Sequence, residues 1–339
     1  SKEHVARRLQ KANVLIIDEL SMLSGEVLSM VDRVLREVRG HERAFGGLQI
    51  VLVGDFFQLP PVSGRGEDVA FAFQSEAFRA LNPLPLYLSE QHRHGDTTLE
   101  SILGNIRNGV ADHSDISRLM TRESEETEVA DDIPRLFTHN ADVDRINQQK
   151  LLALPGNTKT YRMDGSGAPV LIESLKRGCL SPETLALKEK AVVMFTKNNP
   201  VGGYSNGTLG VVTGFESGTN YPVVETRDGR SITVVPQEWA VEEGGKIRAK
   251  ISQLPLRLAW AITIHKSQGQ SLDAAAVDLS RAFEYGQGYV ALSRLRTLDG
   301  LHLLGWHENA LAIHPTVRAH DARFRSASEE AAAAFEELE

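Results

Sequence analysis

The chain has 339 residues, of which 41% are hydrophobic and 24% charged, and its 37 Lys and Arg residues against 45 Asp and Glu residues give a formal net charge of −8. This is ordinary globular composition, and the length suffices for about two domains. The single cysteine, Cys179, excludes an internal disulfide, and no apolar run is long enough for a membrane span or a signal core. These features favour a reducing compartment, which is the bacterial cytoplasm, or the nucleus or mitochondrion if the parent protein is eukaryotic. The acidic balance leaves room for a local basic groove that binds nucleic acid.

Two apolar runs and a helix between them predict a βαβ unit at the start of the chain. Residues 12–19 form a short run rich in β-branched residues that ends at two acids, and residues 48–55 repeat the pattern. Both runs are expected to be strands of a parallel sheet, buried on both faces. Between them, Ser24 is expected to cap an amphipathic helix that covers the sheet and ends at Gly40.

The middle of the chain changes character twice. Residues 109–132 predict a surface connection with one short helix, followed by a strand at 135–138 and a helix at 140–152. Four short β-rich runs then follow between residues 191 and 235, separated by Gly, Asn and Asp turns that include an Asp-Gly hairpin signal at 228–229. They predict a small antiparallel insert, in the form of a compact barrel, over residues 190–253.

The last third of the chain returns to α/β patterning. Residues 256–264 and 274–279 are apolar and β-rich, so the domain interrupted by the insert is expected to resume there. The final residues, 326–339, are rich in Ala and Glu and predict a marginal helix or a frayed tail.

Acids at the end of the first strand are the first candidates for chemistry. A carboxylate at Asp18 can hold Mg²⁺, and its neighbour Glu19 can orient or deprotonate an attacking water, although strands also end in solvated acids for no chemical reason. Gln58 follows the second strand on a loop stiffened by Pro60 and Pro61, where its amide suits the sensing of a terminal phosphate. A loop that merely covers a core would explain the prolines but not the glutamine.

Polar and cationic residues near the end of the chain are further candidates. Residues 264–270 group a cation, two amides and a hydroxyl, which can hold backbone phosphates or simply begin a helix. Arg294 lies on a predicted helix at 289–294, and Arg93 lies in a polar stretch. Each can act as an arginine finger or form a structural ion pair.

Two other patterns carry less weight. His92 and His94 lack a second ligand pair at metal spacing, which argues against a metal site. Four aromatic side chains can stack on bases, although core packing is the simpler expectation for each of them: Phe56, Phe57, Tyr204 and Trp239.

Taken together and in order, these motifs resemble those of the PIF helicases, a family of superfamily 1B 5′-to-3′ DNA helicases. Five segments correspond to the Walker B pair and to helicase motifs III, IV, V and VI, in that order: 18–19, 54–61, 90–93, 262–269 and 287–294. Residues 32–39, followed by 45–49, are similar to the signature that separates this family from its RecD and relaxase-helicase relatives. The resemblance covers the chain from about residue 13 to residue 304.

The resemblance implies an α/β fold of two RecA-like P-loop NTPase domains, with ATP between them and a β-barrel-like insert of the Src-homology-3 kind in the second. The expected segments are 1–88 for the C-terminal part of the first domain, 89–189 and 254–325 for the second, 190–253 for the insert and 326–339 for an acidic helical tail. The implied partner is single-stranded DNA, including forked or structured DNA. The implied motor acts as a monomer in replication, repair or recombination.

Roles for particular residues are carried over by position from the family. The nucleotide site would comprise Asp18 as the Mg²⁺ ligand, Glu19 as the activator of water, Gln58 as the γ-phosphate sensor, Arg93 and Arg294 as transition-state cations and Gly269 as a further ATP contact. The DNA contacts would be Thr138, Asn140, His265, Lys266 and Ser267.

Two departures from the family pattern stand out. His94 occupies a position where the family often has Gln. No G-x-x-x-x-G-K-[S/T] occurs in the chain, so the phosphate-binding loop is expected upstream of Ser1 and the chain is interpreted as an inactive fragment whose first sheet has an unpaired edge. The alternative is a non-hydrolysing module that binds single-stranded DNA or a partner. The retained acids, Gln58 and arginines favour the motor.

Overall fold

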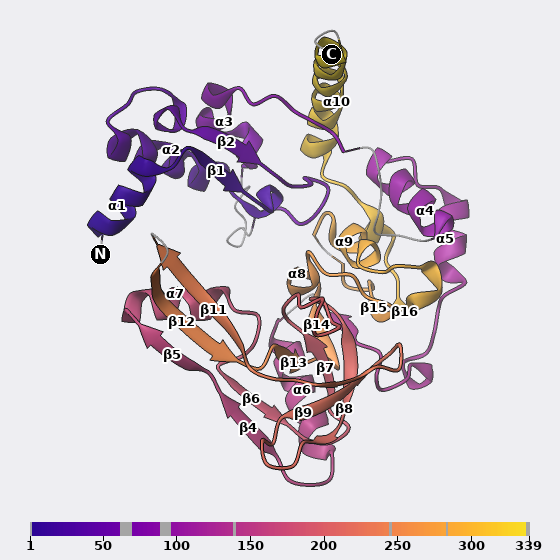
Figure 1. Cartoon of the computed structure of the whole chain (residues 1–339). Coiled ribbons are helices and arrows are strands. Elements are labelled where there is room, and N and C mark those ends of the chain that lie inside the picture. The colour runs from indigo at the N-terminus through magenta and orange to yellow at the C-terminus, as the bar shows by residue number, and fades with distance from the viewer. Residues whose placement is uncertain are drawn as a thin grey trace.

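The computed structural model of the chain describes residues 2–61, 70–88, 96–137, 140–243, 246–282 and 284–336 (Figure 1). Arg93, Thr138 and the pair His92 and His94 lie outside the described residues. We call the described residues up to 88 the first unit and those from 96 onward the second unit.

The first unit is a two-stranded parallel sheet with helices, and it confirms the predicted βαβ arrangement. Its sheet pairs β1 (Val14–Ile17) with β2 (Gln49–Leu52). Its helices are α1 (Lys2–Lys11), α2 (Gly25–Arg39) and α3 (Glu76–Leu81), and its 3₁₀ turns are η1 (Leu20–Met22), η2 (Ala44–Gly47) and η3 (Ala72–Gln74).

Helix α2 begins and ends where the sequence predicts. The backbone N–H of Val27 donates to Ser24 Oγ at 3.2 Å, which satisfies one of the free donors of the first turn. Gly40 ends the helix in the left-handed conformation, with φ of 61°. Leu28 and Leu35 are fully buried in the core of the unit.

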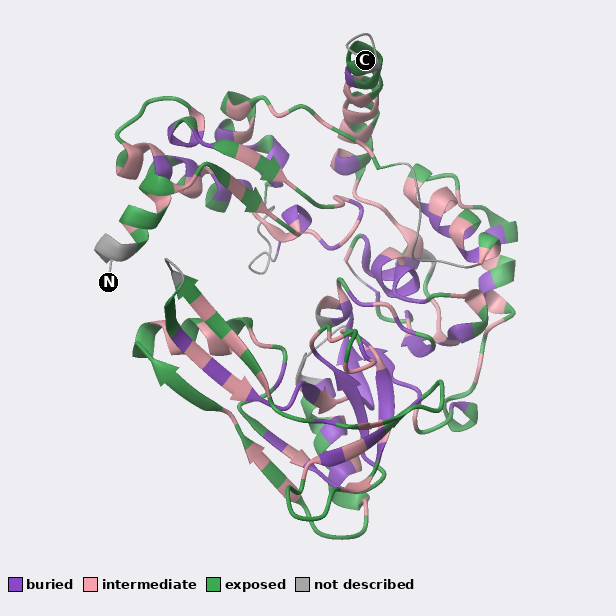
Figure 2. Cartoon of the chain, in the orientation of Figure 1, coloured by how far each residue is buried: buried purple, intermediate pink, exposed green. Residues whose placement is uncertain are grey.

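The expectation that β1 and β2 are buried on both faces is wrong. Leu15 and Ile50 pack into the core under α2, whereas Ile16 is 65% exposed and Val51 37% exposed on the opposite face (Figure 2). Alternate side chains of a strand point to opposite faces, and among the described residues only one face is covered by helices. Part of the apolar stripe expected on α2 is exposed as well: Val27, Met30 and Val34.

The second unit is built on a four-stranded parallel sheet in the order β14-β3-β15-β16. Its strands are β3 (Arg135–Phe137), β14 (Ala261–Thr263), β15 (Ala275–Asp278) and β16 (Leu301–Gly305). Besides α7 (Pro169–Gly178) and α10 (Pro315–Glu336), which are described below, the helices of this unit are α4 (Thr97–Asn108), α5 (His113–Met120), α6 (Asn140–Ala153), α8 (Ile264–Ser267) and α9 (Gln287–Ser293), and its 3₁₀ turns are η4 (Glu126–Glu128), η5 (Leu298–Gly300) and η6 (Glu308–Leu311). This sheet is largely buried, as the sequence predicts for parallel strands (Figure 2).

The predicted insert is an antiparallel sheet, but its described strands do not close into a barrel. The strand order is β10-β9-β8-β7-β13, with β7 (Val192–Phe195), β8 (Leu209–Phe215), β9 (Pro222–Thr226), β10 (Ser231–Thr233) and β13 (Leu256–Leu258). Gly229, with φ of 80°, makes the tight turn between β9 and β10. The edge strands β10 and β13 do not pair with each other, because β13 leads directly into β14 of the parallel sheet.

Several polar strands around the insert have no counterpart in the expected elements. A three-stranded sheet joins β11 (Gln237–Glu243), β12 (Lys246–Gln253) and β5 (Asp164–Gly167), while β4 (Lys159–Arg162) pairs with β6 (Thr184–Leu187) and α7 (Pro169–Gly178) lies between β5 and β6 in the chain. Every residue of β5 is exposed, so the strand lacks the apolar alternation that predicts strands. Strand β5 lies outside residues 190–253 but pairs with β12, which lies inside this range. The predicted domain limits therefore stay predictions.

The C-terminal residues form part of a long helix, α10 (Pro315–Glu336), where a marginal helix or frayed tail is expected. Phe324 on α10 lies against Phe56, Phe73 and Phe78 of the first unit, with ring centroids 6.0 to 6.3 Å apart. This packing explains why α10 is helical although its sequence is only weakly amphipathic. Among the residues that the structure describes, no helix combines the length and the apolar character needed to cross a membrane.

Candidate active site

Asp18 and Glu19 lie directly after β1, as the sequence predicts. Glu19 adopts the left-handed conformation, with φ of 54° and ψ of 46°, and its backbone N–H donates to Asp18 Oδ1 at 2.8 Å. Left-handed backbone at a residue other than glycine is uncommon and costs on the order of 1 kcal/mol or more. Such strain clusters at functional sites, which makes Glu19 a candidate on geometry alone.

The second unit brings residues of 262–269 against Glu19. Gln268 Nε2 donates to Glu19 Oε2 at 2.8 Å. A Cβ built on Gly269, where φ is 74°, would lie 3.7 Å from Glu19 Oε1. The structure therefore joins two predicted site residues, Glu19 and Gly269, that lie 250 positions apart in sequence. Gln268 lies in the same predicted motif, but the sequence assigns it no role in the nucleotide site. The structure places its amide against Glu19.

Gln58 lies on the loop after β2, where its backbone N–H donates to the carbonyl of Asp55 at 3.0 Å. Its side-chain oxygen, Oε1, is buried without a hydrogen-bond partner among the described residues, and the same is true of Gln268 Oε1. A buried amide oxygen requires a donor, and a water that attacks a phosphate is such a donor. The orphaned oxygens therefore fit a site that takes a hydrolysable nucleotide with its water.

Arg294 is only 1% exposed and lies at the C-terminal end of α9. Its guanidinium donates to the carbonyl of Val290 at 3.1 Å, to Ser293 Oγ at 2.8 Å and to the carbonyl of Ser267 at 3.5 Å. In this structure the side chain thus ties α9 to α8. The other predicted cation, Arg93, lies outside the described residues.

The predicted DNA contacts are described only in part. His265 is half-buried on α8, and the side chains of Lys266 and Asn140 lie outside the described part of the chain. Ser267 is fully buried and its hydroxyl donates to the carbonyl of Ile264 at 2.7 Å, so a contact between this hydroxyl and DNA requires the segment to rearrange. Thr138 lies outside the described residues.

The aromatic candidates for base stacking take part in packing. Phe57 and Tyr204 are buried, and Tyr204 stacks on Phe195 with ring centroids 4.1 Å apart. Phe56 belongs to the aromatic cluster under α10. Trp239 is half-buried, with Lys197 Nζ 4.8 Å from its ring centroid. Core packing is thus confirmed for Phe57 and Tyr204.

A contact between the units that no sequence pattern indicates lies beside Gln58. Arg107 Nη1 on α4 donates to Asp55 Oδ2 at 2.7 Å, and Tyr289 Oη on α9 donates to the same oxygen at 3.1 Å. Burial disfavours the Arg107 guanidinium, but the charges and hydrogen bonds of Asp55 and Tyr289 together outweigh this effect and raise the pKa of Arg107 above its usual range. Burial, followed by the nearby Asp55 charge, raises the pKa of Tyr289 to about 12.

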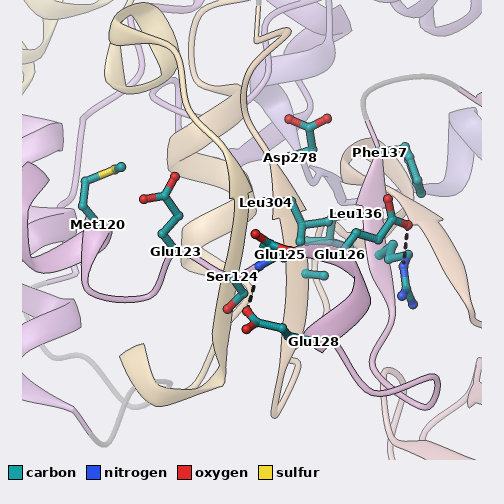
Figure 3. Close-up of a pocket in the computed structure, with 12 residues that line it drawn as sticks. Met120, Glu123, Ser124, Glu125, Glu126, Glu128, Leu136, Phe137, Asp278 and Leu304 are labelled. Atoms are coloured by element: carbon teal, nitrogen blue, oxygen red, sulfur yellow. Dashed lines mark hydrogen bonds and ion pairs between the residues drawn. The ribbon is translucent and has the colours of Figure 1, made fainter.

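A cavity of about 710 Å³ lies apart from these residues (Figure 3). Its lining includes five acidic residues, Glu123, Glu125, Glu126, Glu128 and Asp278, and one basic residue, Arg135. Arg135 Nε pairs with Glu126 Oε1 at 3.2 Å. The remaining negative charge repels phosphates, so this cavity is unsuited to a nucleotide or to a DNA backbone. Within the described ranges, no group of three or more His, Cys, Asp or Glu residues is placed to hold a metal ion.

The fold and these contacts are those of the RecA-like α/β class, with two units that meet at a shared site. Two α/β units meet at loops that follow the carboxyl ends of parallel strands β1, β2 and β14, where such sheets bind ligands.

Comparison with known proteins specifies the family. Residues 1–108 match the PIF1-like helicase family. The ATP-dependent DNA helicase Pif1 of Psychrobacter sp. (strain PRwf-1) is 41% identical over 399 aligned positions, which cover 100% of this chain and 60% of that protein. The ATP-dependent DNA helicase Pif1 of Bdellovibrio bacteriovorus is 33% identical, with 91% of this chain and 70% of that protein covered.

Solved structures agree with this assignment. The crystal structure of Bacteroides sp Pif1 in complex with ADP-AlF4 is 30% identical and superposes with a TM-score of 0.83, covering 96% of this chain and 78% of that one. The chain belongs to the PIF1-like helicase family. It spans 60% of the Psychrobacter protein and 48% of the Xenopus laevis PIF1 helicase.

Proposed function

We propose that the protein to which this chain belongs is an ATP-dependent 5′-to-3′ DNA helicase. It would move along single-stranded DNA and couple ATP hydrolysis to duplex unwinding in replication, repair or recombination. Family membership supports this proposal, as do solved relatives described as bound to ADP-AlF4, to single-stranded DNA and at forked double-stranded DNA. The observation that carries it is the contact of Glu19, after β1, with Gln268, after β14.

The proposed nucleotide site takes ATP and Mg²⁺ between the units. Asp18, which is exposed, would hold Mg²⁺, and the bound ion would neutralise charge on the phosphates. Glu19 would orient and deprotonate the attacking water, and the orphaned oxygen of Gln58 would accept a hydrogen bond from it. The side chains of Arg93 and Arg294 and the backbone of Gly269 complete the proposed site.

The proposed DNA track follows the segments after β3 and β14. His265 and Lys266 would contact backbone phosphates, and Ser267 would join them if its segment rearranges. Thr138 and Asn140 would contribute from the positions that follow β3 in the sequence. Contacts of this kind are blind to sequence and weaken with salt. We further propose that the motor acts as a monomer in a reducing cytoplasm, beside the nucleoid of a bacterium.

The test is steady-state ATP hydrolysis by the full-length protein, with and without single-stranded DNA. Glu19→Gln keeps the shape of the side chain but removes the base, so DNA-stimulated turnover should fall by about 10²- to 10⁴-fold while DNA binding persists. Glu37→Gln, which alters an exposed acid on α2, is the matched control. The 339-residue chain lacks the phosphate-binding loop sequence and is expected to hydrolyse no ATP by itself.

Two outcomes would contradict the proposal. Turnover that survives Glu19→Gln would remove this residue from the chemistry. A full-length protein that binds single-stranded DNA without hydrolysing ATP would instead be the non-hydrolysing module.

A further inference from the structure

The loop that carries Gln58 is shaped by one carboxylate, Asp55. Its Oδ1 accepts the backbone N–H of Phe57 at 3.2 Å, and its carbonyl accepts the backbone N–H of Gln58 at 3.0 Å. Its other carboxylate oxygen, Oδ2, accepts hydrogen bonds from Arg107 and Tyr289 of the second unit. The same side chain therefore folds the loop and joins it to α4 and α9.

Arg107 contacts the loop at two points. Besides its ion pair with Asp55, its guanidinium carbon lies 4.5 Å from the centroid of the Phe57 ring. The side chains of Arg107 and Asp55 are only 27% and 18% exposed, so solvent screens the pair less than it would screen a surface pair. Arg107 thus contacts Phe57, which directly precedes Gln58, and Asp55, which lies three positions before it.

Helix α9 completes the contact. Gly286, at its N-terminus, lies against the carbonyls of Phe57 and Gln58, and Tyr289 Oη lies 3.4 Å from Arg107 Nη1. Movement of α4 relative to the first unit must displace Asp55 or break its partly buried ion pair with Arg107, and movement of α9 must displace Asp55 or break its hydrogen bond with Tyr289.

We propose that Arg107 is a positioning residue, which sets the place of Gln58 by holding Asp55 and Phe57 against the second unit. Arginine suits this task because one planar group can donate to a carboxylate and lie over a ring at once, whereas the point charge of lysine serves mainly the carboxylate. The effect on ATP turnover rests on the proposed function, but the effect on the loop does not.

Hydrogen exchange of the 339-residue chain tests the structural step without any turnover. In Arg107→Gln, backbone amides of residues 55–59 should exchange at least about tenfold faster, while those of the buried sheet β14-β3-β15-β16 keep the wild-type rate. Arg107→Lys, which keeps the charge, should restore part of the protection. Arg118→Gln, which removes an exposed arginine from the neighbouring helix α5, is the control and should leave exchange unchanged.

Steady-state kinetics of the full-length protein test the consequence. Arg107→Gln should lower kcat for DNA-stimulated ATP hydrolysis by about 10- to 100-fold and change KM for ATP far less, because Gln58 is displaced but the nucleotide contacts remain. Asp55→Asn should lower kcat similarly, and the double variant should lose little more than either single one.

The outcomes separate the two proposals. Unchanged exchange at residues 55–59 in Arg107→Gln overturns the positioning role. Faster exchange spread over the whole chain also overturns it, by showing a general structural role. So do kcat losses that simply multiply in the double variant, because they show that Arg107 and Asp55 act independently. If the wild-type full-length protein hydrolyses no ATP although the exchange results hold, the proposed function fails and the positioning of the loop stands.

Discussion

Gly286 shows how a single residue limits the approach of the two units. Its φ is 80°, and a Cβ built there would lie 2.7 Å from the carbonyl oxygens of both Phe57 and Gln58. Contacts below 3.0 Å are essentially never seen for real Cβ atoms, and the left-handed backbone adds its own strain to any other residue. Glycine at this position is therefore favoured by the tertiary contact as well as by the left-handed backbone at the start of α9.

Gly286→Ala should destabilise the contact between the units. We expect the free energy of unfolding of the 339-residue chain to fall by about 1–3 kcal/mol, measured by urea denaturation. Gly104→Ala is the control, because that glycine lies inside α4 with open space around its missing side chain. It should stabilise the chain by up to about 1 kcal/mol through helix propensity. Equal effects of the two substitutions would contradict the close approach at Gly286.

At the scale of elements, α10 is held to the first unit by aromatic packing and by hydrogen bonds to Tyr87. Phe324 contacts the aromatic cluster, while Tyr87 Oη donates to Asp321 Oδ1 at 2.5 Å and the Tyr87 backbone N–H donates to Ser328 Oγ at 3.0 Å. Phe56 belongs both to this cluster and to the loop that carries Gln58. Helix α10 therefore also supports this loop, through the contact of Phe324 with Phe56.

Phe324→Ala should loosen α10. The ring is half-buried, so its removal should lower the free energy of unfolding by about 1–3 kcal/mol and speed amide exchange along α10. Phe335→Ala removes a 54% exposed ring from the same helix and should change neither quantity. If the two substitutions act alike, the helix is stabilised by its own propensity and not by docking.

At the scale of the whole molecule, the first unit presents an apolar surface. Ile16 and Val51 are register partners on the exposed face of the β1-β2 sheet, and Val14 and Val53 are exposed as well. Among the described residues, no further strand pairs with either edge of this sheet. Unpaired edges and apolar faces favour self-association.

The 339-residue chain should therefore associate as its concentration rises, as measured by sedimentation velocity. Ile16→Lys should weaken this association by at least about tenfold, because the ammonium must be desolvated in any contact across the face. Val201→Lys is a control for added charge, since Val201 is fully exposed but lies away from this sheet. Association that Ile16→Lys leaves unchanged would place the contact elsewhere.

Local patterns in the sequence determined the βαβ unit, the caps of α2, the hairpin at Gly229 and the position of Glu19 at a strand end, because apolar period and turn residues act over a few positions. They also carried the family resemblance. They did not indicate β5, whose residues lack an apolar period. The alternation of Ile247, Ala249 and Ile251 in β12 is a strand signal that the expected elements left out.

Only the tertiary structure decided that one face of β1 and β2 is exposed, that the insert is an open sheet and that α10 docks on the first unit. It alone joined Gln268 to Glu19 and Arg107 to Asp55. Each of these depends on contacts between residues far apart in the chain, which a local pattern cannot encode, since what a side chain meets is set by which surfaces the folded chain brings together.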